Sequence, residues 1–460
     1  MAEANVVPAL ADDAEAVAFA TCLIPIALGA DEGHAPRVAR FGHAAQVTVV
    51  TARSAALTPP TLGGKLSRSA NFARHTGRSL LSSSTEASPT LRKTALNPVH
   101  RKMGAKMVDF GGWDMPVEYP ATGGVLAEHM AVRTGVGIFD VSHMGDIRFT
   151  GPQALDAVQH ISMNDASRLV PGQAHYSAML YPEGTFVDDI IVHKIADDHY
   201  YFVINAGTRE KDAGWVEQNV GGFRCKAENV SDDYTQIAIQ GPKAQALLQK
   251  LTDADLAQIR NYWFTFGTVC GLKNTMIART GYTGEDGFEI YIPADPQTSA
   301  RVWNEMLEAG REFGAIPCGL GARNTLRLEA KMALYGHEIS ETINVFEAGL
   351  DRWCKLEKPE FIGKPALERI KTQGVKRTLV GLEMIERGIA RDGYPIVDDD
   401  GRGIGCVTSG SVAPFLKKNI ALAYVPLDRA EVGTVLNVEI RGQKVKAKVV
   451  PTPFYKRPKK

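Results

Sequence analysis

The sequence predicts an α+β protein in which two related halves precede a small β domain. Residues 146–161 (DIRFTGPQALDAVQHI) and 234–251 (YTQIAIQGPKAQALLQKL) share one order: an apolar strand, a Gly-Pro turn and an amphipathic helix. From about Lys376 onward the helical patterns give way to short strands and turns, typical of a separate β-barrel or β-sandwich. With 460 residues the chain exceeds one ordinary domain, so we expect two or three.

Folded sequence begins near Asn97. The apolar alternation of residues 107–119 is broken by Gly111-Gly112, which predicts a strand with a turn. The elements expected next are a helix over 124–133, a strand over 137–151, the helix of the first repeat, a hairpin over 174–195 that turns at Pro182-Glu183-Gly184, a strand over 199–207 and a helix over 207–220.

The second half continues in the same style. After the second repeat, residues 262–293 contain strands separated by glycines, and residues 298–319 and 321–332 favour helices. The strands expected in the C-terminal domain lie within residues 377–386, 394–410, 419–426 and 434–451.

The N-terminal region differs in composition from the rest of the chain. Residues 33–85 contain no Asp or Glu but seven Arg or Lys and many Ser, which is typical of an organelle transit peptide. Residues 2–15 are acidic, and the apolar run over 16–30 resembles a signal-peptide core but is too short to span a bilayer. We favour a mitochondrial presequence over chloroplast or secretory targeting.

Bulk composition argues against several classes of partner. The formal net charge is +0, with 44% hydrophobic and 23% charged residues, which gives no support for nucleic acid or a membrane as the main partner. The six cysteines are widely spaced without a Cys-x-x-Cys pair, so no zinc, iron–sulfur or thioredoxin-like site is expected.

An adjacent pair of carboxylates interrupts an apolar strand in the stretch GTFVDDIIV. Asp188 and Asp189 must point to opposite faces, because side chains alternate along a strand. At most one of them can easily reach solvent, and a buried unpaired carboxylate costs several kcal/mol, roughly. The other is therefore paired or lines a cavity.

A second motif, RTGYTGEDGFEIYIP (residues 279–293), has turns rich in glycine followed by an alternating strand. Glu289 and Tyr291 share one face of that strand. A solvated outer face on an edge strand would explain Glu289 without any function. That explanation is the more common one for a single Glu in a strand. The neighbouring glycines shift the balance somewhat toward a ligand contact, because they let a backbone approach closely.

A third motif places Arg323 and Arg327 four residues apart on one helix face, in GLGARNTLRLEAK. Either the two form a salt-bridged helix surface, or they form an anion clamp near the helix N-terminus. The GLG does not continue as G-x-G-x-x-G, so no NAD or FAD site is supported. His129, His143 and His337 lack metal-ligand spacing, so we expect hydrogen-bonded core or surface histidines and no metal.

In order along the chain, these stretches resemble the glycine-cleavage T-proteins, the tetrahydrofolate-dependent aminomethyltransferases. The resemblance runs from about Pro98 to Tyr455 and is carried by FDVSHMG, VDDIIV, QGP, GYTGEDGFEI, GARNTLRLEA, LYGHEI, EAGL, FIGK, GCVTSG, LKKNIALAYV and TPFYK. Val345 replaces a proline common in the family, which affects a loop.

The resemblance implies a three-domain cloverleaf around a folate site. Residues 1–95 would be the mitochondrial transit peptide and a disordered N-terminal extension, residues 96–370 two interleaved α+β folate-binding domains, and residues 371–460 a β-barrel. The implied reaction takes an aminomethyl group from the dihydrolipoyl arm of lipoylated H-protein to tetrahydrofolate in the mitochondrial matrix. It yields 5,10-methylenetetrahydrofolate, ammonia and reduced lipoyl.

The resemblance also implies roles for single residues. Asp189 matches the family's key aspartate, facing the reacting folate nitrogens while Asp188 faces away. Glu289 matches the pterin-binding glutamate and Arg323 a folate-contacting arginine. Tyr455 matches a C-terminal folate-contacting tyrosine, and Asn205 is a candidate for the site wall.

Two relatives of the same fold provide alternative functions. Folate-binding proteins that support iron–sulfur cluster assembly carry a Lys-Gly-Cys-Tyr-x-Gly-Gln-Glu stretch. This chain has TGYTGEDGFE there, without the cysteine, and retains the catalytic-type aspartate. Dimethylglycine and sarcosine dehydrogenases carry a large FAD domain ahead of the folate domain, where this chain has about a hundred residues that resemble a targeting sequence.

Overall fold

The computed structural model describes residues 90–458. The predicted transit peptide and extension, residues 1–95, fall almost wholly outside the described residues. Within residues 90–458, no helix is long and apolar enough to cross a membrane.

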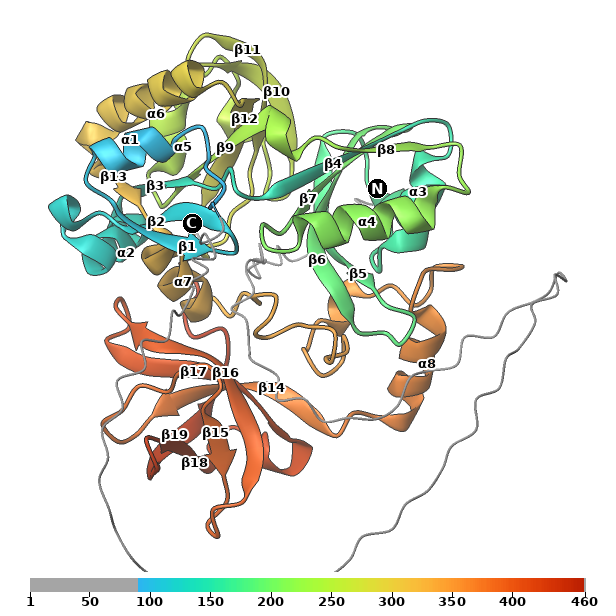
Figure 1. The fold of residues 1–460 in the computed structure, drawn as a ribbon, viewed down its shortest axis with the longest axis vertical. Helices are drawn as coiled ribbons and strands as arrows, with labels where there is room; N and C mark the ends of the chain where they lie inside the picture. Colours follow the sequence, from blue (N-terminus) through green and yellow to red (C-terminus); the bar gives the residue numbers. More distant parts are fainter. Residues whose placement is uncertain (1–89, 459–460) are drawn as a thin grey trace, which may run out of the picture. The chain divides into compact units, whose positions relative to one another are not determined.

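A six-stranded sheet forms the first α+β domain, in the order β10-β11-β12-β9-β3-β13. Its strands are β3 (Val136–Asp140), β9 (Tyr234–Gln240), β10 (Phe264–Val269), β11 (Leu272–Ala278), β12 (Gly287–Pro293) and β13 (Ala315–Cys318). Helices α1 (Asn97–Lys102), α5 (Ala244–Gln249) and α6 (Pro296–Gly310) lie together on this domain (Figure 1). Ile138, Ile239 and Trp303 meet in the core between sheet and helices.

The β1 (Lys106–Phe110) and β2 (Trp113–Glu118) hairpin and α2 (Gly124–Thr134) precede β3. The sequence predicted both elements. It did not predict the break in the strand expected over 137–151. The segment between Asp140 and Gly145 leaves the first sheet, so that β4 (Gly145–Thr150) begins the second.

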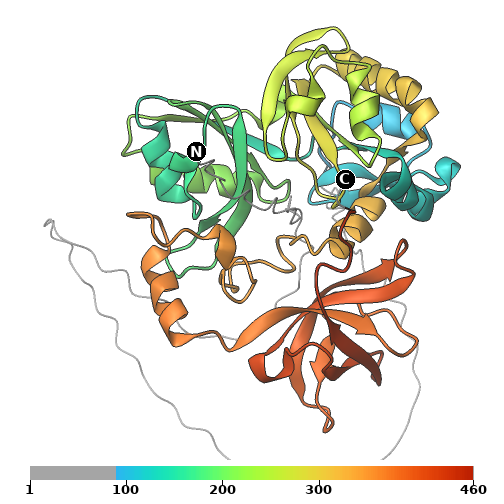
Figure 2. The ribbon, with the colours of Figure 1, turned by 180° about the vertical axis from the view of Figure 1, so that it is seen from behind.

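The second α+β domain is a five-stranded sheet in the order β5-β6-β7-β4-β8. It comprises β4 together with β5 (Gln173–Leu180), β6 (Phe186–Ala196), β7 (His199–Ile204) and β8 (Lys226–Asn229), and the predicted hairpin is β5–β6. Helices α3 (Ala154–Ile161) and α4 (Arg209–Val220) pack on this domain over a core that includes Phe149, Ile190 and Val216. Figure 2 shows the two α+β domains from behind.

The internal repeat is confirmed by one shared corner. β4 ends at Thr150 and β9 at Gln240. The glycines that follow, Gly151 and Gly241, both have φ of +133°, and each leads through a proline into a helix, α3 or α5. A Cβ on Gly151 would lie 2.6 Å from the Arg224 carbonyl oxygen, and one on Gly241 would lie 2.4 Å from that of Gly135. Both corners therefore require glycine.

The C-terminal domain is a closed barrel in the order β14-β17-β16-β15-β18-β19. Its strands are β14 (Arg377–Met384), β15 (Pro395–Val397), β16 (Gly403–Ala413), β17 (Lys418–Pro426), β18 (Val435–Ile440) and β19 (Gln443–Val450). Small and branched side chains such as Leu382, Ala421 and Val438 fill its core. Closure decides between the barrel and sandwich alternatives and pairs every strand edge.

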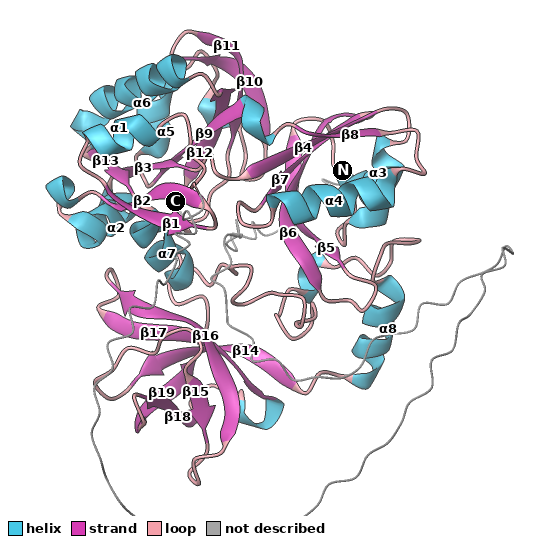
Figure 3. Cartoon of the chain, in the orientation of Figure 1, coloured by secondary structure: helices cyan, strands magenta, loops and turns pink. Residues whose placement is uncertain are grey.

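Helix α7 (Leu320–Glu329) joins the parts. It contacts α2, β2 and the barrel strand β16. A long loop segment then leads to α8 (Lys364–Gln373) and on into the barrel (Figure 3). The α+β fold with three domains is thus confirmed.

We expect Gly241→Ala to lower the free energy of unfolding by about 2–4 kcal/mol, because the added methyl meets backbone in a conformation that L-residues rarely adopt. Gly214→Ala is the matched control: a Cβ there, within α4, has no neighbour within 4 Å and should raise stability by roughly 0.5–1 kcal/mol. Urea unfolding midpoints measure both variants, and equal midpoints would contradict the strained corner.

Candidate functional site

Strand β6 places both adjacent aspartates in the protein interior. Asp188 shares its face with Ile190, which packs in the core with α3 and α4. Asp189 shares its face with Ile191, which packs in the core that both sheets contribute to. The expected opposite orientation is confirmed, yet neither residue reaches solvent: Asp188 is 0% and Asp189 2% exposed.

Asp189 accepts two side-chain hydrogen bonds. The Tyr176 hydroxyl on β5 lies 3.1 Å from its Oδ2, and Asn205 Nδ2 lies 3.1 Å from its Oδ1. Burial raises the pKa of Asp189 well above its ordinary value, and the neighbouring Asp188 raises it further, while Asn205 and Tyr176 oppose the shift.

Asn205 joins the two aspartates from the turn that follows β7. Its amide also donates to Asp188 Oδ1 at 2.5 Å. The predicted wall residue is therefore a bridge between the carboxylates. Its own Oδ1 is buried and accepts no hydrogen bond from any residue in the described part of the chain.

Glu289 lies on β12, which pairs with β11 on one side and β9 on the other. The explanation by a solvated edge strand is therefore wrong: Glu289 is 5% exposed and accepts a hydrogen bond from the Thr280 hydroxyl. Burial raises its pKa to about 7, although Thr280 and Arg323 act in the opposite direction.

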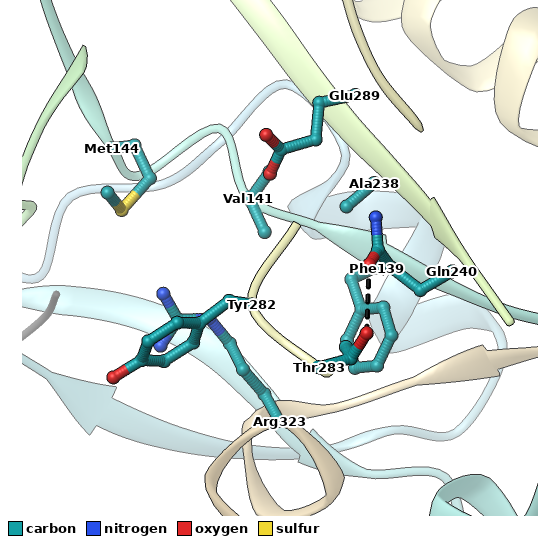
Figure 4. A pocket seen from close by; sticks show the side chains of 9 residues that line it. All are labelled: Phe139, Val141, Met144, Ala238, Gln240, Tyr282, Thr283, Glu289 and Arg323. Atoms are coloured by element: carbon teal, nitrogen blue, oxygen red, sulfur yellow. Dashed lines mark hydrogen bonds between the residues drawn. The ribbon is translucent and has the colours of Figure 1, made fainter. Parts of the chain in front are cut away.

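A pocket opens beside Glu289 (Figure 4). It contains about 320 Å³ of space free of protein atoms, including its opening to solvent. Nine residues line it: Phe139, Val141, Met144, Ala238, Gln240, Tyr282, Thr283, Glu289 and Arg323. Figure 4 shows the apolar side chains as walls around the Glu289 carboxylate, with Thr283 donating to Gln240 at 2.9 Å.

Arg323 reaches the pocket from α7, with its guanidinium 4.3 Å from the centre of the Tyr282 ring. Burial lowers its pKa, whereas Tyr282, Glu289 and Asp189 favour its charge. Tyr282 likewise interacts with both Asp189 and Arg323. Three predicted site residues thus interact electrostatically although they come from two sheets and one helix: Asp189, Glu289 and Arg323.

Arg327 does not take part, so the two-arginine clamp is wrong. Its guanidinium is buried and donates to Glu338 at 2.8 Å and to Ser409 at 2.9 Å. The ion pair holds Arg327 in place, and its hydrogen bond to Ser409 on β16 connects α7 to the barrel. The alternative of a salt-bridged helix surface is confirmed for the salt bridge but wrong for the surface, because the Arg327 side chain is 1% exposed.

Tyr455 is not among the nine residues that line the pocket. Its ring is stacked on the Arg133 guanidinium at 3.9 Å, and its backbone N–H donates to the Glu329 carbonyl oxygen at 2.8 Å. Arg133 in turn pairs with Glu285 and Glu329, both at 2.9 Å. The C-terminal segment is therefore held against α7 at its C-terminal end.

The histidines behave differently from one another. His129 bonds to Thr325 at 2.8 Å, as expected of a core histidine. His143 does not: it is fully buried, and neither ring nitrogen has a hydrogen-bond partner among the described residues. Burial and Arg323 lower its pKa to about 3. Across residues 90–458, no His, Cys, Asp and Glu cluster is arranged to hold a metal.

Sequence reasoning missed Tyr176 and Tyr282. Tyr282 belongs to the glycine-rich motif around Glu289, so the motif offered a signal. Tyr176 could have been identified only from the pairing register of the strands. Ala178 pairs with Asp189, so Tyr176, two residues before Ala178, is the diagonal neighbour of Asp189. The register shifts between Met179 and Leu180, so counting residue pairs outward from the hairpin turn gives the wrong partner for Asp189.

Family profiles match almost the whole described chain. The GCVT N-terminal domain covers residues 96–358, and the glycine cleavage T-protein C-terminal barrel domain covers residues 377–456. The chain belongs to the glycine cleavage T-protein family. As a member it is an enzyme of the glycine cleavage system, an aminomethyltransferase.

Individual T-protein relatives agree over most of their length. The aminomethyltransferase of Acidobacterium capsulatum is 69% identical over 378 residues, 82% of this chain and 99% of that protein. That of Bacillus subtilis is 45% identical over 80% of this chain and all of that protein, 100%. A solved structure, glycine cleavage system aminomethyltransferase T from Bartonella henselae, superposes with a TM-score of 0.74 at 33% identity over 79% of this chain and 98% of that one.

We expect Glu289→Gln to become progressively more stable than the wild type as pH rises. The folded pKa of Glu289 is about 7, against 4.5 ordinarily, so the folded state binds more protons between these values. Wild-type stability therefore falls as pH rises through this window, by about 3 kcal/mol from this group. Glutamine carries no titrating proton and escapes that loss.

Unfolding free energies of both proteins between pH 4 and pH 8 measure this difference. Glu431→Gln, at an exposed position, is the control and should follow the wild-type curve. Parallel curves for Glu289→Gln and the wild type would contradict the assigned burial of this carboxyl.

Proposed function

We propose that the enzyme transfers an aminomethyl group from the dihydrolipoyl arm of lipoylated H-protein to tetrahydrofolate, forming 5,10-methylenetetrahydrofolate and releasing ammonia. The observation that carries this proposal is the buried Asp189, with its raised pKa, in electrostatic contact with Arg323 and Tyr282 of the pocket. Membership of the T-protein family supplies the class of donor and acceptor.

The side chains that line the pocket suit a pterin ring chemically. Phe139, Val141 and Met144 offer apolar walls to a flat heterocycle, and Glu289 offers two carboxylate oxygens. A carboxylate can accept two parallel hydrogen bonds from a ring N–H and an exocyclic amine, a bidentate geometry that gives orientation as well as affinity. The Asn205 Oδ1, buried without a partner in the described chain, can accept a further hydrogen bond from a ligand.

Asp189 acts in proton transfer. Burial raises the pKa of Asp189 well above its ordinary value, so this carboxyl holds a proton more readily than an exposed one and can take up and return a proton during the reaction, as general acid–base catalysis requires. In its ionised form it stabilises the iminium-like cation that develops when the aminomethyl carbon loses its nitrogen. Tyr176 and Asn205 orient its two oxygens.

Arg323 and Tyr455 would contact the rest of the folate. Arg323 carries positive charge at the pocket wall, which suits an anionic tail or nearby polar groups. Tyr455 is half-buried beside Arg133, so its contact requires a ligand that extends beyond the nine lining residues.

The alternative, a folate-binding iron–sulfur cluster assembly factor, shares the fold and the folate pocket. The stretch that carries a cysteine in that class reads TGYTGEDGFE here. Both functions predict folate binding, so turnover distinguishes them: only the transferase releases ammonia from aminomethylated H-protein when tetrahydrofolate is added.

We expect Asp189→Asn to abolish that ammonia release, because the amide cannot take up the proton, while folate affinity stays within about threefold of wild type because shape and hydrogen bonding persist. Ammonia release with purified proteins and folate titration by fluorescence measure the two effects. Undiminished turnover would remove Asp189 from the mechanism.

Glu289→Ala tests the binding role of this residue separately from catalysis. It should weaken folate binding by about 2 kcal/mol or more, because the ligand's donors lose their buried acceptor. Turnover at saturating folate should persist at a measurable level, which separates a binding residue from the reacting acid. An unaltered dissociation constant would contradict the pterin assignment.

The mitochondrial matrix location remains a prediction from the composition of residues 33–85. The relatives described above are bacterial and match about four-fifths of this chain. Incubation of the full chain with isolated mitochondria checks the prediction: protease-protected, N-terminally shortened protein is expected, and a chain left outside at full length would refute it.

A further inference from the structure

A second acidic pair lies behind Asp189. Asp188 on β6 and Asp212 on α4 are both 0% exposed. Asp188 accepts hydrogen bonds from the Asp189 backbone N–H at 2.9 Å, from Asn205 at 2.5 Å and from the Thr208 hydroxyl at 2.6 Å. Each of these donors points an N–H or O–H at the Asp188 carboxylate, so its oxygens are well supplied with hydrogen bonds.

Asp212 has no such support. Neither of its oxygens accepts a hydrogen bond from an N–H or O–H of the described residues, while the Asp188 carboxyl lies within hydrogen-bonding reach. Thr208 is also close, but it has a single proton, which it donates to Asp188. Two ionised carboxylates in contact and out of water would repel strongly. One proton on Asp212, donated to Asp188, satisfies both groups.

The charged and titratable groups around the pair leave this arrangement intact. The Lys211 ammonium, from α4, lowers the pKa of Asp212, but it donates to the Val187 carbonyl oxygen at 2.5 Å and to the Tyr335 hydroxyl at 2.7 Å. Burial and Asp188 outweigh it and keep the pKa of Asp212 well above the ordinary value. Among residues 90–458, the other groups that face the pair are Tyr181, Tyr335 and, across Tyr181, Glu341.

Resting on the proposed function, we propose that Asp188 and Asp212 share one proton and act together as positioning residues, which hold Asp189 through Asn205. The coupling is geometric: one Asn205 amide donates to Asp188 and Asp189 at once. The pair carries a fixed charge of −1, which lies closest to Asp189 when it is on Asp188. This charge opposes ionisation of the Asp189 carboxyl.

Two isosteric variants form a matched test. Asp212→Asn donates an amide hydrogen to Asp188 and leaves the negative charge beside Asp189. Asp188→Asn donates to Asp212 instead and moves the same charge one residue farther away. Each variant retains one carboxylate and nearly the same volume, so a purely structural role predicts similar effects.

We expect the limb of the kcat/KM–pH profile that Asp189 sets to move to lower pH by about one unit in Asp188→Asn and to stay in place in Asp212→Asn. An unmoved limb in Asp188→Asn, or equal movement in both variants, would overturn the coupling. Circular dichroism melts of each variant establish that it is folded.

Infrared difference spectroscopy tests the shared proton without turnover. The wild-type minus Asp212→Asn spectrum at neutral pH should contain the C=O stretch of one protonated carboxyl, and its absence would overturn the proposal. If Asp212→Asn does not fold, the wild-type minus Asp188→Asn spectrum takes its place: it should contain the same C=O stretch, and its absence would overturn the proposal equally. Active Asp189→Asn would refute the proposed function alone, because the infrared result does not depend on it.

Discussion

The burial of two adjacent carboxylates on β6 is the constraint around which the site is built. An ionisable pair away from water is tolerated only where donors compensate it, and here one asparagine, two hydroxyls and a backbone N–H converge on Asp188 and Asp189. The donors do not fully offset the cost of burying the two carboxylates, and the remaining cost is reflected in the raised pKa of Asp189. The strand is therefore less favourable for folding than an apolar one, and it holds a carboxyl with a raised pKa away from water.

The duplicated architecture explains how the remaining groups reach that acid. Each half contains a strand, a Gly-Pro corner at a left-handed φ and a helix, and each sheet turns one face toward a common core. Asp189 comes from the five-stranded sheet, Glu289 from the six-stranded sheet and Arg323 from α7. Because the residues belong to different elements with their own cores, their separation is fixed by packing and does not depend on loop conformation.

The barrel contributes none of the nine residues that line the pocket. Its role in the site is indirect and passes through α7. The buried pair Arg327–Glu338, extended to Ser409 on β16 and Thr408 beside it, attaches the helix to the barrel. At the end of the same helix, Glu329 contacts both Arg133 and the C-terminal segment at Tyr455. Arg323 is thereby held by its neighbours one turn farther along.

The sequence by itself determined the α+β class, the repeat, the C-terminal β domain, the buried strand with two acids on opposite faces, and the ordered family motifs around Glu289 and Arg323. These are local or periodic properties that adjacent residues encode. Only the tertiary structure decided that the barrel is closed, that Arg327 is locked in an ion pair, that Tyr455 rests on Arg133, and that Asp212 approaches Asp188 from another element. Each of these depends on contacts between residues distant in sequence, whose register and packing no local pattern specifies.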